Sequence, residues 1–347
     1  MMPTEPSGRP NQAGSQVRYV ALGGLRTDFV ITAEGEVILN QHGGNAIYSA
    51  AGMRLWADGV GLVGRVGCNF PDDWLHEARA AGLDLSGVRR LPTWQETRTF
   101  YAYLPDGCRQ DRDPIRHFAS LGRPMPAELE GYTSSTVDFA RSEPNPLSLT
   151  LDDFPSDYLT ADGIHLAPYD LWTHSHLAPA LSESGPALIT LDPNYGYAFA
   201  EQLETVCSFL PYVTAFLPSE LEAQGLLGPL KPAQAAQWFV QNGARCVVVK
   251  LGGQGSLVLE AGQGRLWRVP AYPARVQDLT GAGDVFCGGF LVGYAETGDP
   301  VRAAQYGTVS ASFAIESRGG LATSQVSRCQ AEERLAWLTL HRPPQPC

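Results

Sequence analysis

Short apolar runs recur along the chain, and several are followed by stretches with the spacing of a helix. The runs lie at residues 17–24, 60–67, 163–167, 187–192, 213–218 and 246–252. Apolar runs of this length without alternation are typical of strands buried on both faces of a parallel sheet. Segments such as 72–81, 285–296 and 301–316 have the composition of helices. The pattern therefore predicts an α/β fold with a central, mostly parallel sheet flanked by helices.

A second type of strand signal appears in three short segments. Residues 29–32 and 36–40 flank an Ala-Glu-Gly turn, and residues 98–107 alternate between apolar and polar positions before an Asp-Gly turn. Alternation predicts strands with one face covered and one face more exposed. Tyr101 and Tyr103 are expected to serve sheet packing here. The charged, Pro-rich stretch at 109–132 gives no clear prediction.

Composition narrows the functional classes. The chain has 347 residues and a formal net charge of −11, with no basic cluster, so we expect neither nucleic acid nor a membrane surface as a partner. Residues 1–16 are polar and lack an apolar core, which predicts a disordered tail before a domain at 17–340. Seven scattered cysteines without a CxxC pair favour reduced thiols and a cytoplasmic location.

The most informative stretch is Asp278-Leu-Thr-Gly-Ala-Gly-Asp284, which runs directly into an apolar helix. Gly281, Ala282 and Gly283 are small enough for a tight turn, and a turn that opens a helix aims free N–H groups at one point. That point suits an anion such as a phosphoryl group. Asp284 at the start of the helix could accept the proton of an attacking hydroxyl. The alternative role for Asp284 is that of a helix N-cap.

The order Asp278-x-Thr-Gly-Ala-Gly-Asp284-x-x-x-Gly-Gly-Phe resembles the C-terminal signature of the ribokinase-like (PfkB) carbohydrate kinases. The resemblance implies a three-layer sandwich with a small β-sheet lid, here built from about 29–40 and 98–107. It implies ATP and Mg²⁺ as cofactors, Asp284 as catalytic base, and the 281–284 turn as anion hole. A monovalent cation, K⁺, would be held by backbone carbonyls near Asp278 and residues 312–321.

The N-terminal half carries the expected acceptor residues. Asp28 follows the first strand at the end where open α/β sheets bind ligands, and a surface-turn role is the alternative. The resemblance implies that Asp28 holds the hydroxyls of the substrate and that Gly43 and Gly44 lie against the sugar. Asn45 stands close to, but not at, the position where the family usually carries Asn.

The resemblance also implies a nucleotide site in the C-terminal half. Its expected residues are Asn194 of the Asp192-Pro-Asn194 motif, Glu222, which would hold Mg²⁺ through water, Lys250, Gly253, Gly255 and Thr280. Gly196 stands near the place of a family Arg, and Ser219 replaces the family Asn. A capping box formed by Ser219 and Glu222 is compatible with the same assignment.

The function expected from these features is ATP-dependent phosphorylation of a hydroxyl of a small sugar or sugar-like molecule. Two alternatives within the fold stay open: a nucleoside kinase, and a non-catalytic sugar or nucleoside binder on a decayed scaffold. An NAD-linked oxidoreductase lacks support because no Gly-x-Gly-x-x-Gly follows the first strand. Related sugar kinases clasp their lids into homodimers, and the resemblance implies a homodimer through the lid for this chain. Nucleoside-type relatives instead cover the lid within one chain, and residues 109–132 could form such a cover. His174 and His176 are expected in a surface loop.

Overall fold

The computed structural model describes residues 16–104, 109–134, 139–186 and 188–347. The expected tail at 1–16 therefore lies outside the described residues except for its last position, as does the 105–107 end of the expected second lid segment. No helix in the described part of the chain is long and apolar enough to cross a membrane.

The central sheet has ten strands among the described residues, in the order β14-β13-β12-β11-β10-β9-β8-β1-β4-β5. Six neighbouring pairs from β11 to β5 are parallel, and β12, β13 and β14 add an antiparallel edge. The strands are β1 (Tyr19–Leu22), β4 (Val60–Val66), β5 (Leu83–Arg90), β8 (Gly163–Leu166), β9 (Ile189–Leu191), β10 (Ala215–Phe216), β11 (Cys246–Lys250), β12 (Ser256–Glu260), β13 (Leu266–Val269) and β14 (Gln345–Pro346). The ordered sheet thus extends past the expected domain end at 340.

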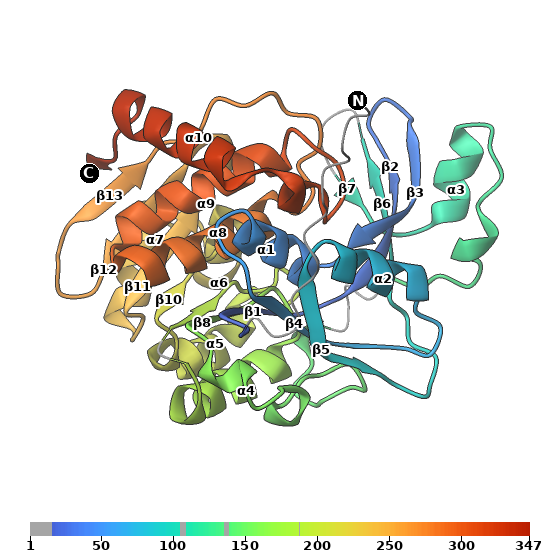
Figure 1. Cartoon of the computed structure of the whole chain (residues 1–347), viewed down its shortest axis with the longest axis horizontal. Coiled ribbons are helices and arrows are strands. Elements are labelled where there is room, and N and C mark those ends of the chain that lie inside the picture. The colour runs from blue at the N-terminus through green and yellow to red at the C-terminus, as the bar shows by residue number, and fades with distance from the viewer. Residues whose placement is uncertain (1–15, 105–108, 135–138, 187) are drawn as a thin grey trace, which may run out of the picture.

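Helices cover both faces of this sheet (Figure 1). Within β1, Tyr19 and Ala21 pack into the apolar cluster that includes α1 and α9, whereas Val20 and Leu22 pack into the cluster that includes α4 and α7. This alternation is the period of a strand buried on both sides. The helices are α1 (Asn45–Arg54), α2 (Asp72–Ala80), α3 (Pro114–Ser120), α4 (Leu171–Ser184), α5 (Leu203–Phe209), α6 (Glu220–Leu227), α7 (Pro232–Gln241), α8 (Ala282–Thr297), α9 (Pro300–Ala314) and α10 (Arg328–His341).

A second, four-stranded sheet lies at one end of the molecule and forms the expected lid (Figure 1). Its order is β3 (Val37–Gly43), β2 (Arg26–Ile31), β6 (Arg98–Tyr103) and β7 (Arg109–Gln110). The first lid strand begins earlier than predicted, because the chain enters β2 directly after the glycines that follow β1. The hairpin at Ala33–Gly35 is confirmed, since the Gly35 N–H donates to the Thr32 carbonyl at 2.9 Å.

The stretch at 109–132 covers the outer face of this lid. Phe29 and Phe100 lie on the face of the lid next to α3, where they pack with Phe118 and Leu129 in one apolar cluster. Phe118 and Leu129 are 2% and 1% exposed. The apolar face of the lid is therefore buried within one chain.

The expectation of a surface loop at His174 and His176 is wrong. Both residues lie in α4, and His174 is fully buried. Its Nδ1 lies 2.6 Å from the Tyr197 hydroxyl and its Nε2 lies 3.0 Å from the Ala167 carbonyl oxygen. Burial lowers the pKa of His174 to about 4, so this imidazole is a neutral connector within the core.

Candidate active site

The turn at 281–284 has the geometry that its sequence predicts. Gly281 is the residue before α8 and adopts a left-handed φ of 73°. Asp284 is in the first turn of the helix and is not its N-cap, so the alternative capping role does not apply. A helix start with a carboxylate in its first turn combines free N–H groups with a candidate base.

Two independent constraints make Gly281 necessary. Its positive φ is costly for any residue with a Cβ. In addition, a Cβ at this position would lie 2.2 Å from the ring of Tyr48, which packs across the turn from α1. The Tyr48 ring therefore packs too closely against the turn for any side chain at position 281.

A buried charge pair lies beneath the turn. The Lys250 ammonium donates to a carboxylate oxygen of Asp192, and the Cys287 Sγ lies 3.6 Å from the same ammonium. Burial alone would lower the pKa of Lys250, but the carboxylate of Asp192 outweighs burial and raises it. A Cβ added at Gly283 would stand 3.6 Å from the Lys250 Nζ. A permanent positive charge thus lies next to the candidate anion hole.

The predicted acceptor residues converge on the same place. A Cβ at Gly43 would overlap the Asp28 carboxyl group at 2.0 Å, so the glycine gives Asp28 room to lie against β3. The Asn45 Nδ2 donates to the Asp284 Oδ1 at 3.0 Å. Asn45 is therefore a direct partner of the candidate base, which the spacing of the motif alone did not indicate.

The remaining residues expected in the nucleotide site form hydrogen bonds with their own neighbours in the chain. The Ser219 N–H donates to the Glu222 Oε2 at 2.7 Å and the Glu222 N–H donates to the Ser219 Oγ at 3.3 Å, which completes the predicted capping box. The Asn194 Oδ1 accepts from the Gly196 N–H at 2.7 Å. A Cβ at Gly196 would stand 2.9 Å from the Cβ of Phe139, so Phe139 fills the space that a larger residue at 196 would need.

These residues line one cavity of about 580 Å³ between the lid and the main sheet. Of the residues predicted from the sequence, the ones that line it are Asp28, Gly44, Asn45, Asn194, Glu222, Lys250, Thr280, Gly281, Gly283 and Asp284. Gly43 and Ala282 lie directly beside lining residues in the chain, and the Asp278 Oδ1 accepts from the N–H of the lining residue Thr280 at 2.9 Å. Gly253 and Gly255 do not line it. Gly255 instead allows a tight turn into β12, since a Cβ there would stand 2.0 Å from the Val269 carbonyl oxygen.

Several lining residues were not identified from the sequence. The lid supplies Arg26, Thr99 and Tyr101 to the cavity, and the Tyr103 hydroxyl lies 2.6 Å from the Thr280 Oγ1. The assignment of both tyrosines to sheet packing was therefore wrong. Asp28, Thr99 and Tyr101 lie on the face of the lid opposite Phe29 and Phe100. Because side chains alternate between the two faces of a strand, the predicted role of Asp28 could have identified Thr99 and Tyr101 as residues that face the cavity.

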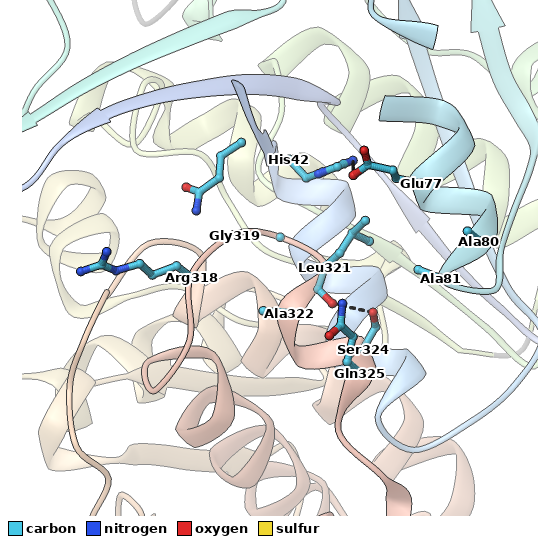
Figure 2. A pocket seen from close by; sticks show the side chains of 12 residues that line it. His42, Glu77, Ala80, Ala81, Arg318, Gly319, Leu321, Ala322, Ser324 and Gln325 are labelled. Carbon is cyan, nitrogen blue, oxygen red and sulfur yellow. Dashed lines mark hydrogen bonds and ion pairs between the residues drawn. The ribbon is translucent and has the colours of Figure 1, made fainter. Parts of the chain in front are cut away.

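A second cavity, of about 760 Å³, lies on the far side of β3 (Figure 2). Of the segments with a predicted role that the structure describes, only residues 318–321, from the stretch expected to hold K⁺, line it. Figure 2 shows His42 and Glu77 side by side, with the Nε2 and Oε2 atoms 3.4 Å apart. Burial lowers the pKa of His42 and Glu77 partly opposes this shift. A lowered pKa keeps the His42 imidazole uncharged near neutral pH, so it does not neutralise the neighbouring Glu77 carboxylate.

Comparisons with known proteins agree with the site. Residues 154–326 match the family model described as pfkB family carbohydrate kinase. A cytidine kinase from Thermococcus kodakarensis is 25% identical over 276 residues, which covers 80% of this chain and 88% of the relative. A sugar kinase of undefined substrate from Archaeoglobus fulgidus is 32% identical over 131 residues, but the match spans only 51% of its length.

Solved structures confirm the fold. A nucleoside kinase from Burkholderia thailandensis in complex with inosine has a TM-score of 0.67 at 17% identity, covering 94% of this chain and 100% of that chain. An Escherichia coli protein solved as a candidate ribokinase II with ATP and Mg²⁺ has a TM-score of 0.66 at 20% identity, covering 92% and 99% of the two chains. ATP with Mg²⁺ is thus used within this fold family. The predicted sandwich and lid are confirmed, and the chain belongs to the ribokinase-like PfkB family of kinases, which makes it a phosphotransferase.

Proposed function

We propose that the chain transfers the γ-phosphoryl group of ATP to a hydroxyl of a small sugar, either free or as the sugar part of a nucleoside. The observation that carries this proposal is the convergence of Asp284, Asp28 and Lys250 on one cavity at the start of α8. Asp28 would hold the acceptor hydroxyls, and Asp284 would remove the proton from the hydroxyl that attacks.

The anion hole supplies the electrostatic part of the mechanism. The N–H groups of the 281–284 turn would stabilise charge that develops on the transferred group, which is the main source of catalysis in such reactions. Lys250 adds a fixed positive charge beside the turn. Asn45 holds Asp284 in position through its side-chain amide. The lid excludes water, and Tyr103 fastens it to Thr280.

The donor set in the cavity fits Mg²⁺. Glu222 and Asp192 both line it, and the Asp192 Oδ1 is buried with no hydrogen-bond partner among the described residues. Carboxylate oxygens, with water and phosphate, are the ligands that Mg²⁺ prefers. When bound, the ion would neutralise phosphate charge. We further propose that Glu222 acts through water.

A K⁺ site and a cytoplasmic location belong to the same proposal. The N–H groups of Gln277 and Asp278 both donate to the Ile315 carbonyl, so the two segments expected to hold K⁺ lie side by side. The six cysteines that the structure describes are all free, which suits a reducing compartment.

The test is an ADP-release assay of the full chain with Mg²⁺, ATP and a panel of sugars and nucleosides. Asp284→Asn should lower kcat by about 10²- to 10⁴-fold with nucleotide affinity unchanged, since the amide keeps the shape of the side chain but cannot accept the proton. Near-normal turnover in this variant would refute the assignment of the base. Acceptor binding without any turnover by the wild-type chain would instead support the non-catalytic alternative.

A further inference from the structure

Arg26 is a buried cation at the acceptor end of the active-site cavity. It opens β2, two residues before Asp28, and is only 9% exposed. Its Nη1 donates to the Glu96 carbonyl at 2.8 Å. Among the described residues, the rest of its guanidinium has neither a carboxylate partner nor a further hydrogen bond. Burying such a group is costly unless a partner is supplied.

The same arginine also lines a smaller side cavity. Arg26 and Phe139 lie in the walls of both the active-site cavity and an adjoining cavity of about 200 Å³. Most of the other polar groups of the side cavity are already bonded within the protein: Glu96 is paired with Arg98, and Gln95 and Asn145 hold neighbouring loop atoms. Asp170 accepts from Thr173, and the Tyr169 hydroxyl donates to the Leu147 carbonyl. An occupant must therefore bring hydrogen-bond acceptors to Arg26.

The spacing along β2 connects this side cavity to the acceptor. Residues two apart on a strand point to the same face and stand about 6.6 Å apart. That separation is close to the width of a sugar ring. A sugar held by Asp28 consequently presents its far substituent to Arg26 and the side cavity.

Charge and shape limit what this substituent can be. The charged side chains that line the active-site cavity are Arg26 and Lys250 against Asp28, Asp111, Asp192, Glu222 and Asp284. The side cavity adds Arg141 against Glu96 and Asp170, so the two cavities together have an excess of negative charge. An additional anion is disfavoured there. The side cavity is larger than a single carboxylate requires, and Phe139 and Tyr169 give it aromatic walls. A neutral planar ring with acceptor atoms on its edge satisfies all three conditions.

We propose that the acceptor is a nucleoside whose base enters the side cavity, and that Arg26 is the residue that selects it. This inference rests on the proposed phosphotransfer and specifies its substrate class. A guanidinium presents parallel N–H groups, which match two adjacent acceptor atoms. Cytosine offers such a pair at O2 and N3, and guanine or hypoxanthine at O6 and N7. Uracil and adenine lack it.

The test compares acceptors and arginine variants in the full chain. We expect kcat/KM for cytidine or inosine to exceed that for D-ribose and for a ketodeoxy-sugar acid by about 100-fold, and to exceed that for uridine and adenosine as well. Arg26→Met should lower the nucleoside kcat/KM by about 10- to 100-fold, mainly through KM, and lower the ribose kcat/KM much less. Arg26→Lys keeps the charge without the planar group, so we expect a smaller loss. Arg18→Met, in an exposed ion pair with Asp162, is the matched control.

The outcomes separate this inference from the proposed function. Preferred turnover of ribose or of the sugar acid, still dependent on Asp284, would overturn the nucleoside assignment while the phosphotransfer stands. An equal loss for every acceptor in Arg26→Met, with a lowered Tm, would show that Arg26 only braces the Glu96 carbonyl. Turnover of no acceptor at all would overturn both. Calorimetric titration of cytidine into the wild type and Arg26→Lys gives a second measurement independent of turnover.

Discussion

Substituting Gly281 by alanine tests whether the anion-hole turn depends on the geometry described above. The left-handed φ of 73° costs an alanine about 1–2 kcal/mol. The Cβ would also stand 2.2 Å from the Tyr48 ring, and overpacking of this kind costs about 1–3 kcal/mol. The sum predicts that Gly281→Ala lowers the free energy of unfolding by about 2–5 kcal/mol.

The effect on catalysis should be larger than the effect on stability. To relieve the overlap, the turn must move relative to Tyr48, and the N–H groups of the anion hole move with it. A displacement of about 1 Å in a catalytic group can cost about 10²-fold in rate. We therefore expect kcat/KM to fall by about 10²-fold at a temperature where the variant remains folded, as judged by circular dichroism.

Gly283→Ala is the matched control in the same turn. Gly283 has no positive φ, and its Cβ would make an ordinary contact of 3.6 Å with the Lys250 Nζ. We expect its Tm to stay close to that of the wild type. If Gly281→Ala is as stable and active as the wild type, or if both variants lose stability equally, the steric argument for the turn is wrong.

Three further predictions concern the lid. Asp28→Ala should raise the acceptor KM about tenfold or more while the ATP KM stays unchanged, because a hydrogen bond to a carboxylate contributes about 1.5–3 kcal/mol. A change confined to the ATP KM would show that the acceptor does not bind at the Asp28 end of the cavity. Tyr103→Phe removes the bond to Thr280 and should raise the acceptor KM about 2- to 10-fold with little change in Tm; an unchanged KM would show that the bond does not hold the lid over the acceptor. Light scattering at micromolar concentration should give the single-chain mass of 37.4 kDa, because α3 already covers the apolar face of the lid. A measured mass of twice this value would support the homodimer through the lid instead.

The sequence predicted the main sheet and the anion-hole turn because both depend on local signals. Apolar runs such as 246–252 identify buried strands, and the glycine at 281 has a direct conformational reason. The strand ends were less accurate: residues 213–218 contain only the two-residue strand Ala215–Phe216. Where a buried run passes into a loop, hydrophobicity does not change, so composition alone cannot mark the boundary.

Contacts across the chain could not be predicted in the same way. The bond from Asn45 to Asp284 joins residues 239 positions apart, and Phe139 fills the space beside Gly196 from a distant segment. His174 was misplaced because an imidazole looks polar in a sequence, whereas its two buried bonds make it a core residue. In each case the partner decides the role, and the partner is known only once the chain is folded.

The residue proposed to bind the acceptor and the residues proposed to act in phosphoryl transfer belong to two different hydrophobic cores. Asp28 belongs to the lid sheet, which has its own apolar cluster with α3, whereas Asp284 and Lys250 belong to the main sandwich. An acceptor that bonds to Asp28 and also presents its hydroxyl to Asp284 joins these units in addition to Tyr103. Its binding energy then contributes to keeping the catalytic groups in register with the substrate. A water molecule, which reaches only one unit, cannot supply this link, so the division of the site between two cores disfavours hydrolysis of ATP.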